Sequence, residues 1–424
     1  MSYKKISVIG LGYIGLPTAA VLASKNKTVI GVDVNEEIIK KVNEGRIHII
    51  EPHLEEIVST VVKEGYLKAT SKTENSDAFI IAVPTPFKKE LKHIPEPDLK
   101  YIKSAANSIA PKLKKGNLII LESTSPVGTT KQLTKWLSEL RPDLLFPLNT
   151  DEKPDVNIAY CPERVLPGKV IEELTSNDRV VGGMTDNCSK RAIQLYKIFV
   201  KGKCIQTDSQ TAEMVKLTEN SSRDVQIAFA NELSILCDKL DINVRELISL
   251  ANLHPRVNIL QPGPGVGGHC IAVDPWFIVS KNPKEAKLIY TARTVNDSKP
   301  KWVIEKIRES IIEHRKRSKE KKEEDVRLTF YGMTFKADID DIRESPALEI
   351  IREIISTSTV QVFAVEPNLK RIDENIKLIS SKDANKNTDI AVLLVDHKEF
   401  KEINRPNASI IIDTKGIWEK NADR

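Results

Sequence analysis

Short apolar runs alternate with amphipathic helical patterns along the first half of the chain. Runs rich in β-branched residues predict strands at 6–9, 28–32, 78–83, 118–121 and 157–160. Apolar residues that recur every three or four positions predict helices near 13–24, 98–110 and 128–140. Strands that alternate with helices in this way form a parallel sheet with helices on both of its faces.

The pattern changes at residue 211, after which neither glycine nor proline occurs until beyond residue 240. Apolar residues follow a period near 3.6 there, which predicts a helix about 45 Å long at a rise of 1.5 Å per residue. Such a helix is longer than one small domain is wide, so we expect it to connect two domains and to offer a dimer surface. A second, smaller α/β pattern follows it, with strands at 326–331, 360–365, 390–395 and 410–412 and a helix from Pro346.

Composition and charge exclude several classes of protein. The 424 residues exceed a single core, and a hydrophobic share of 40% excludes a disordered chain. The net charge of +5 is spread over the whole length, which does not suit a nucleic-acid binder. Apolar runs are strand-sized, so we expect no membrane span, and the start runs into a strand without a signal-peptide pattern. Five scattered cysteines without CxxC spacing argue against disulfides and metal sites and for a reducing cytoplasm.

The first glycine-rich turn has the pattern of a dinucleotide site. Gly10-Leu-Gly12-Tyr-Ile-Gly15 follows a predicted strand directly and opens a predicted helix. The glycines let the backbone approach a pyrophosphate, which the N–H groups at the helix start then bind. Asp33 ends the next strand, where a carboxylate accepts hydrogen bonds from ribose hydroxyls and repels a 2′-phosphate. We therefore predict NAD as the cofactor, although a glycine turn by itself can be only a turn.

Hydroxyl residues follow two later strands of the same predicted sheet. Thr85 comes after the strand at 78–83, while Thr124 and Thr130 come after the strand at 118–121. Ligands of open α/β sheets bind at the carboxyl ends of the strands, which favours a binding role. Each segment alone is more often a loop or a helix cap than a site.

One cysteine stands out from the other four. Cys270 lies in the densest glycine cluster, Gly263-Pro-Gly-Val-Gly267-Gly-His269-Cys270, followed by Asp274. Glycine neighbours leave a thiol accessible to substrate, and a thiol near cations or backbone N–H groups becomes a nucleophile. Most free cysteines are core residues, as expected for Cys237 in the apolar helix. His269 need not act as the base, because neighbours in an extended segment point to opposite faces.

Polar groups with suitable spacing provide candidate ligands for an anionic substrate. Lys216, Asn220 and Arg223 share one face of the long helix, which is either a solvated stripe or a site for a sugar nucleotide and an oxyanion. Three further clusters could bind a diphosphate, although each alone would more often be surface charge: Arg164 beside Glu163, His254 with Arg256, and Lys336 with Arg343.

Taken together, these motifs resemble the NAD-dependent nucleotide-sugar 6-dehydrogenases of the UDP-glucose/GDP-mannose dehydrogenase family. GxGxxG, STSPVG, PERxxPG, KLxEN, GGxC and FKxDxDDxRESP occur in the family's order over nearly the whole chain. The expected fold is α/β, with two Rossmann-like doubly wound parallel-sheet domains joined by a long central helix. We expect an NAD-binding domain at 1–205, a central helical dimerisation domain with the cysteine loop at 206–310, and a UDP-sugar-binding domain at 326–424.

The resemblance also implies roles for individual residues. Cys270 would be the thiol nucleophile and Lys216 the general acid/base and oxyanion partner, assisted by Glu163, Asn220 and Asp274. The residues implied to contact NAD are Gly10, Gly12, Tyr13, Ile14, Gly15, Asp33, Thr85, Thr124, Thr130 and Lys336. The residues implied to hold the sugar nucleotide are Arg164, Val165, Lys216, Asn220, Arg223, His254, Arg256, Gly267, Lys336 and Arg343. Some of them would come from the neighbouring subunit of a homodimer or dimer-based oligomer.

The cysteine segment departs from the UDP-glucose branch of the family, which usually reads GGSCFxKD. His269 and Val273 stand where that branch has serine and lysine. The difference favours a UDP-N-acetylhexosamine, with the manno configuration implied by resemblance and UDP-N-acetylglucosamine or UDP-glucose as alternatives. Two other classes stay open: a nucleotide-binding scaffold without chemistry, and a two-electron dehydrogenase of the hydroxyacid type, which needs no thiol.

Overall fold

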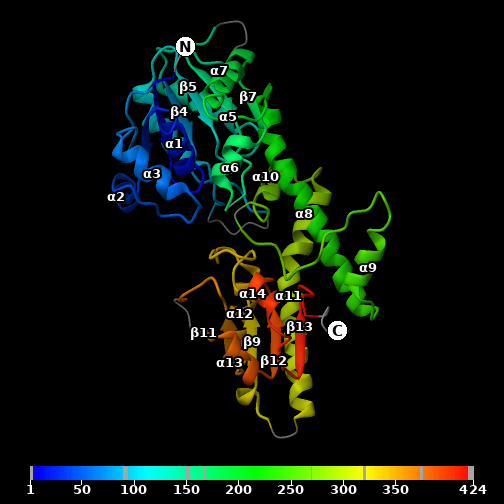
Figure 1. The fold of residues 1–424 in the computed structure, drawn as a ribbon. Helices are drawn as coiled ribbons and strands as arrows, with labels where there is room; N and C mark the ends of the chain where they lie inside the picture. The colour runs from blue at the N-terminus through cyan, green and yellow to red at the C-terminus, as the bar shows by residue number, and fades with distance from the viewer. Residues whose placement is uncertain are drawn as a thin grey trace. The chain divides into compact units, whose positions relative to one another are not determined.

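The computed structural model describes residues 3–88, 94–148, 153–166, 168–268, 270–318, 321–372 and 376–418. The chain forms two compact units, Met1–Glu219 and Asn220–Arg424, each with its own sheet (Figure 1). The boundary falls inside the long helix α8 (Ser209–Lys239), so the expected division into three domains stays a prediction. Across the described residues, no helix is both long and apolar enough to span a bilayer.

The first unit is built on an eight-stranded sheet with the order β3-β2-β1-β4-β5-β6-β7-β8. Neighbouring strands pair in parallel, except that β7 runs antiparallel to β6. The strands are β1 (Lys5–Ile9), β2 (Thr28–Val32), β3 (Leu67–Thr70), β4 (Ala78–Ile81), β5 (Leu118–Leu121), β6 (Asn157–Tyr160), β7 (Arg179–Gly183) and β8 (Cys204–Asp208). The five strands predicted from the sequence are confirmed, while β3, β7 and β8 had not been singled out.

Helices cover both faces of this sheet, which explains why the central strands β4 and β5 are apolar throughout. Leu118 and Ile120 of β5 pack into one core cluster, and Ile119 and Leu121 pack into a second cluster. Successive strand residues point to opposite faces, so both faces are buried. The helices are α1 (Gly15–Ala23), α2 (Glu36–Asn43), α3 (Leu54–Lys63), α4 (Lys100–Ile109), α5 (Thr129–Leu140), α6 (Val170–Ser176) and α7 (Asp186–Tyr196).

The second unit contains a five-stranded, wholly parallel sheet with the order β11-β10-β9-β12-β13. Its strands are β9 (Arg327–Tyr331), β10 (Gln361–Val365), β11 (Lys377–Leu378), β12 (Ile390–Leu393) and β13 (Ile410–Asp413). Its helices after α8 are α9 (Val244–Ala251), α10 (Asp274–Lys281), α11 (Lys287–Arg317), α12 (Pro346–Thr357), α13 (Ser381–Lys386) and α14 (Lys398–Glu402). The predicted α/β class, with two Rossmann-like parallel sheets and a long helix, is confirmed.

A second helix of 31 residues, α11, follows in the region expected to be helical, although its bounds were not predicted, and it contains Pro300, a residue that usually ends a helix. Polar side chains bind α11 to α8 within this unit. Arg293 donates a hydrogen bond of 2.6 Å to Oδ1 of Asp224, and Asn296 donates one of 2.8 Å to the same atom. All three side chains are buried. The polar residues of the long helix thus include members of the core as well as candidate ligands.

Candidate active site

Each glycine of the first turn meets a different spatial constraint. Gly10 has a φ of +93°, and a Cβ there would lie 2.6 Å from the carbonyl oxygen of Ala82. A Cβ on Gly15 would lie 1.8 Å from the carbonyl oxygen of Gly10. At Gly12, by contrast, no heavy atom of the described chain lies within 4 Å of the Cβ position. The turn is therefore close-packed on two sides and open at its middle glycine, which leaves room for a pyrophosphate above the start of α1.

Asp33 is held at the carboxyl end of β2, beside this turn. Its Oδ2 accepts a hydrogen bond of 2.9 Å from the backbone N–H of Leu11, and its Oδ1 accepts one of 2.9 Å from Asn35. The strand order places the chain reversal between β1 and β4, where open α/β sheets bind nucleotides. The half-buried carboxylate is fixed in the position expected for a ribose ligand. The residues present thus fit NAD.

Asp33→Ala should weaken NAD binding about 10- to 100-fold, because a hydrogen bond to a charged group contributes ~1.5–3 kcal/mol. Binding of the sugar nucleotide should change far less. Calorimetric titration of each ligand measures the two effects separately. Asp143→Ala is the matched control, because Asp143 forms an exposed ion pair with Arg141 in the same unit. Equal losses for both ligands would show that the ribose assignment is wrong.

Two of the three predicted threonines after β4 and β5, Thr85 and Thr130, use their hydroxyls in hydrogen bonds within the protein. Thr85 donates a hydrogen bond of 2.6 Å to the carbonyl of Thr124, which ties the two strand ends together. Thr130 is fully buried, and its N–H and Oγ1 lie 2.7 and 2.6 Å from Oε1 of Glu213. The Glu213 carboxylate, on α8, therefore offsets the partial positive charge at the N-terminus of α5. Sequence reasoning missed Glu213, because its neighbours in the sequence are mixed polar and apolar residues and give no local signal of its partner. Contact of these threonines with NAD stays a prediction.

Two ion pairs hold the segment after β6. Glu163 accepts a hydrogen bond of 2.9 Å from Nη2 of Arg179, whose side chain is 4% exposed. Arg164 binds the carboxylate of Glu219 on α8 through Nε at 3.0 Å and Nη2 at 2.6 Å. Val165 packs half-buried against the first core cluster. Neither Arg179 nor Glu219 was identified from the sequence, because single charged residues carry no local signal of their partners.

The second unit brings two predicted catalytic residues together. Asn220 donates a hydrogen bond of 2.5 Å to Oδ2 of Asp274, the first residue of α10. The N–H of Asp274 binds the carbonyl of Cys270 at 2.9 Å. Cys270 is the exposed member of the five cysteines, whereas Cys237 is buried in α8. Lys216 and Arg223 lie on the same helix as Asn220, half-buried and exposed respectively.

The glycines before Cys270 pack closely on the loop that carries Lys336 and Arg343. A Cβ on Gly267 would lie 2.4 Å from the carbonyl oxygen of Glu344, and one on Gly268 would lie 2.9 Å from the ring of Phe335. Glycine is therefore required for this approach, and it brings two segments more than 60 residues apart in sequence together within one unit. Lys336 and Arg343 are exposed there. His269 lies outside the described residues.

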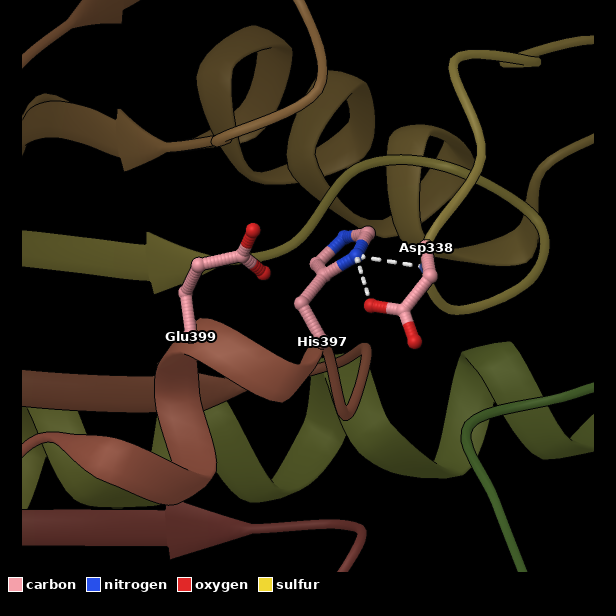
Figure 2. A group of neighbouring side chains, drawn as sticks. All are labelled: Asp338, His397 and Glu399. Atoms are coloured by element: carbon pink, nitrogen blue, oxygen red, sulfur yellow. Dashed lines mark hydrogen bonds and ion pairs between the residues drawn. The ribbon is translucent and has the colours of Figure 1, made fainter.

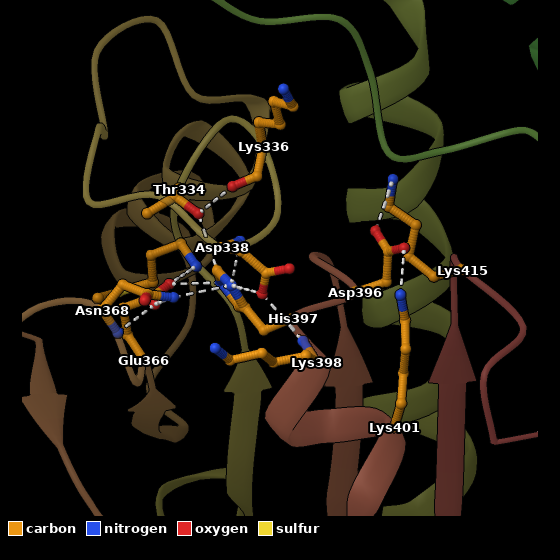
Figure 3. A network of polar contacts seen from close by, with 11 residues as sticks. Thr334, Lys336, Asp338, Glu366, Asn368, Asp396, His397, Lys398, Lys401 and Lys415 are labelled. Atoms are coloured by element: carbon orange, nitrogen blue, oxygen red, sulfur yellow. Dashed lines mark hydrogen bonds and ion pairs between the residues drawn. The ribbon is translucent and has the colours of Figure 1, made fainter. Parts of the chain in front are cut away.

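A buried histidine supports the loop of Lys336 from below (Figure 3). The Nδ1 of His397 accepts a hydrogen bond of 2.9 Å from the N–H of Asp338, and Nε2 lies 3.2 Å from Oε2 of Glu366. Thr334 donates its hydroxyl to the carbonyl of Lys336 at 2.8 Å. Burial would raise the pKa of Glu366, but hydrogen bonds from His397 and from two backbone N–H groups outweigh it and hold the pKa below its usual range.

Glu366 has, in the second unit, the structural role that Asp33 has in the first, since each carboxylate accepts a backbone N–H beside a glycine turn. The N–H groups of Met333 and Asn368 bind its two carboxylate oxygens at 2.7 and 3.0 Å. Gly332 has a φ of +89°, close to that of Gly10. In the second unit, however, the carboxylate is fully buried against His397. This glycine turn therefore anchors a loop and offers no free acid to a ribose.

Asp338, His397 and Glu399 have ligand atoms within 4.8 Å of one another (Figure 2). Both ring nitrogens of His397 are engaged with groups of the protein, as described above. A metal would have to displace these hydrogen bonds to gain a lone pair. We assign this group a structural role and no metal.

His254 and Arg256 follow α9 and are exposed. The N–H of Arg256 binds Nδ1 of His254 at 3.3 Å, so the two residues form one local turn. In the described chain, neither side chain has a hydrogen bond or ion pair with Cys270 or with the loop of Lys336. Their predicted contact with the sugar nucleotide stays a prediction.

Comparison with known proteins identifies what the chain is similar to. Three models of the UDP-glucose/GDP-mannose dehydrogenase family match it: the NAD binding domain over residues 4–200, the central domain over 210–298 and the UDP binding domain over 329–420. The UDP-N-acetyl-D-mannosamine dehydrogenase of Yersinia pestis is 57% identical over 99% of this chain and 100% of the relative. The NDP-N-acetyl-D-galactosaminuronic acid dehydrogenase of Ralstonia solanacearum is 53% identical, over 99% and 97%. A solved UDP-D-ManNAc dehydrogenase of Pyrococcus horikoshii superimposes with a TM-score of 0.85 at 37% identity, over 97% and 96%.

Proposed function

Because the chain belongs to the UDP-glucose/GDP-mannose dehydrogenase family, we propose that it oxidises C6 of a UDP-N-acetylhexosamine to the uronate, with UDP-N-acetyl-D-mannosamine as the first candidate. The enzyme is an NAD-dependent oxidoreductase that acts on a nucleotide sugar. The observation that carries the proposal is the exposed Cys270, one turn before an Asp274 that is bound to Asn220. We also propose that the enzyme is located in the cytoplasm and acts in polysaccharide synthesis.

A nucleophilic thiol explains how one site carries out a four-electron oxidation. The Gly10–Gly15 turn and Asp33 would hold NAD, which would supply the hydride acceptor for each of the two oxidations. The Cys270 thiolate adds to the C6 aldehyde and forms a thiohemiacetal, which holds the intermediate in the site. Oxidation converts this adduct to a thioester, and water then releases the carboxylic acid and the thiol. In sum, the alcohol and one water give the acid, two hydrides and two protons.

The surrounding side chains would move protons and stabilise charge. The Lys216 ammonium would face the reacting oxygen, and the loss of one such donor costs about 3 kcal/mol in the barrier. Asn220, held by Asp274, offers an amide one helical turn along the same helix. Glu163, fixed by Arg179, would accept a proton from the hydrolytic water. Lys336 and Arg343 would bind the diphosphate from the loop packed against the cysteine segment.

Initial rates with a panel of sugar nucleotides test the substrate. UDP-N-acetyl-D-mannosamine should give the highest kcat/KM, with two NADH formed per sugar consumed. Preference for UDP-N-acetylgalactosamine, which the Ralstonia relative makes a second candidate, would correct the configuration, and preference for UDP-N-acetylglucosamine would do the same. Preference for UDP-glucose would contradict the N-acetylhexosamine assignment. One NADH per sugar would indicate a two-electron enzyme, and none would indicate a scaffold.

We further propose that the enzyme works as a homodimer built on α8. Phe229 and Leu236 on α8 are 53% and 48% exposed, Leu240 directly after α8 is 67% exposed, and Leu253 beyond α9 is 78% exposed. Exposed large apolar side chains of this kind mark association surfaces. A partner bound there would let His254 and Arg256 complete the sugar site of the neighbouring subunit.

A further inference from the structure

Two buried acids and one buried cation meet where β5, β6 and β7 end or begin in the first unit. Glu122 directly follows β5 and is 3% exposed. Glu163 follows β6 with a side chain that is 8% exposed, and Arg179 opens β7 with one that is 4% exposed. The guanidinium binds Glu163 at 2.9 Å and also donates to the carbonyl of Leu174 at 3.4 Å.

The two other ionisable side chains that contact Arg179, Tyr196 and Cys161, carry no charge while they are protonated, so this cation balances only one acid. The phenol of Tyr196, on α7, donates a hydrogen bond of 2.6 Å to Oε1 of Glu122 and lies under the guanidinium of Arg179, 4.7 Å from ring centroid to Cζ. Burial raises the pKa of Tyr196 well above its usual value and that of Cys161 to about 12. Thr18 on α1 contributes only a hydroxyl. One acid therefore keeps its proton over part of the pH range.

Hydrogen-bond partners distinguish the two acids. Glu163 is in direct contact with Arg179 and also accepts the N–H of Arg164 at 2.8 Å, so both of its oxygens have donors. Glu122 has the Tyr196 phenol as donor, while its Oε2 has no hydrogen-bond partner among the described residues. Burial raises the pKa of Glu122 to about 7, an effect that Arg179 reduces and the Glu163 charge increases.

We propose that Arg179 and Glu122 are positioning residues for Glu163. Arg179 binds the Glu163 carboxylate, and Glu122 does not compete for this cation as long as Glu122 stays neutral. The inference rests on the proposed role of Glu163 in hydrolysis. When Glu122 ionises, a second buried anion competes for the same guanidinium, and Glu163 loses its fixed orientation. Turnover should then fall on the alkaline side.

The pH dependence of kcat tests this role. In the wild-type enzyme kcat should decline as pH rises through the titration of Glu122, and Glu122→Gln, which cannot ionise, should lose that limb. Tyr196→Phe removes a hydrogen bond that lowers the pKa of Glu122, so it should move the limb to higher pH. Glu139→Gln, at an exposed position of α5, is the matched control and should keep the wild-type profile.

Thermal unfolding provides a readout that is independent of turnover. The folded state binds the Glu122 proton more tightly than the unfolded state, because its folded pKa is raised. The wild-type Tm should therefore fall as pH rises from the ordinary carboxyl range through about 7. Glu122→Gln lacks this loss, so its Tm relative to wild type should rise over the same interval. A constant difference in Tm would contradict the buried, neutral Glu122.

A double-mutant cycle separates this inference from the proposed function. Glu163→Gln should lower kcat by about 100-fold, Arg179→Gln should lower it comparably, and the double variant should lose little more. Should Glu163→Gln turn over like wild type, the hydrolytic role fails. If Glu163→Gln is impaired while the Glu122→Gln profile matches wild type, the role of Glu122 is overturned and the proposed function stands. If the two losses are additive as activation free energies, so that the fold-losses in kcat multiply, the role of Arg179 is overturned.

Discussion

Cys270→Ser should abolish net formation of the uronate, with turnover lowered by ~10³-fold or more, while NAD and the sugar nucleotide still bind. A serine hydroxyl is far less ionised than a thiol at neutral pH, so it does not capture the aldehyde. Cys270 is exposed, and the exchange of sulfur for oxygen leaves the glycine packing on the loop of Lys336 unchanged. The NADH formed per sugar and the mass of the quenched protein measure the effect.

Cys204→Ser is the matched control, because Cys204 lies half-buried in β8, away from the glycine cluster in sequence. Its turnover should stay within about twofold of wild type. Mass spectrometry of the quenched wild-type enzyme should find the sugar nucleotide attached to Cys270 as a thioester. Complete oxidation to the uronate by Cys270→Ser would refute the covalent step and leave the NAD site untouched.

Arg293→Met should destabilise the second unit by ~3–5 kcal/mol, because removal of one partner of a buried ion pair leaves the other charge uncompensated. Arg293 and Asp224 are 1% and 0% exposed and 2.6 Å apart. Burial raises the pKa of Asp224, and Arg293 offsets part of that effect. Without Arg293 the folded state holds the Asp224 proton more tightly still, so the deficit should grow as pH rises above the ordinary carboxyl range.

Urea unfolding at two pH values measures this loss. Asp224→Asn added to Arg293→Met removes the stranded charge and should recover part of the stability at the higher pH. Arg308→Met is the control on the same helix, because its pair with Glu353 is about half exposed and such pairs contribute ~0–1 kcal/mol. Equal unfolding midpoints for Arg293→Met and wild type would show that the buried pair does not stabilise the fold.

Elements with a strong local signal were predicted well. The strands at 118–121 and 157–160 have the predicted bounds, because their apolar runs are buried on both faces. The helix predicted from 211 to 240 spans Ser209–Lys239. The bounds of helix α11 were not predicted within the expected helical region; Pro300 disfavours a continuous helix there, and buried hydrogen bonds to α8 support it. Strand β7 was missed because its two glycines weaken the strand signal, which only pairing on both sides restores.

The candidate site shows the same distinction. Gly10, Asp33 and Cys270 could be chosen from the sequence, because a turn that needs glycine, an acid at a strand end and a thiol among glycines each have a local pattern. The structural partners of other candidate residues could not be chosen from the sequence. Glu213 at Thr130, Arg179 at Glu163 and His397 under the loop of Lys336 are contacts over long sequence separations, and nothing in the flanking residues encodes them.

The amino-acid sequence by itself determined the two α/β repeats, the dinucleotide turn, the preference for NAD and an accessible cysteine among glycines, since all of these follow from periodicity and backbone chemistry within a few residues. The tertiary structure alone decided that Asn220 binds Asp274, that the cysteine segment packs on the loop of Lys336, and that Arg179 binds Glu163 while Tyr196 binds Glu122. Such facts depend on which strand ends lie side by side, and strand order is a property of the folded sheet.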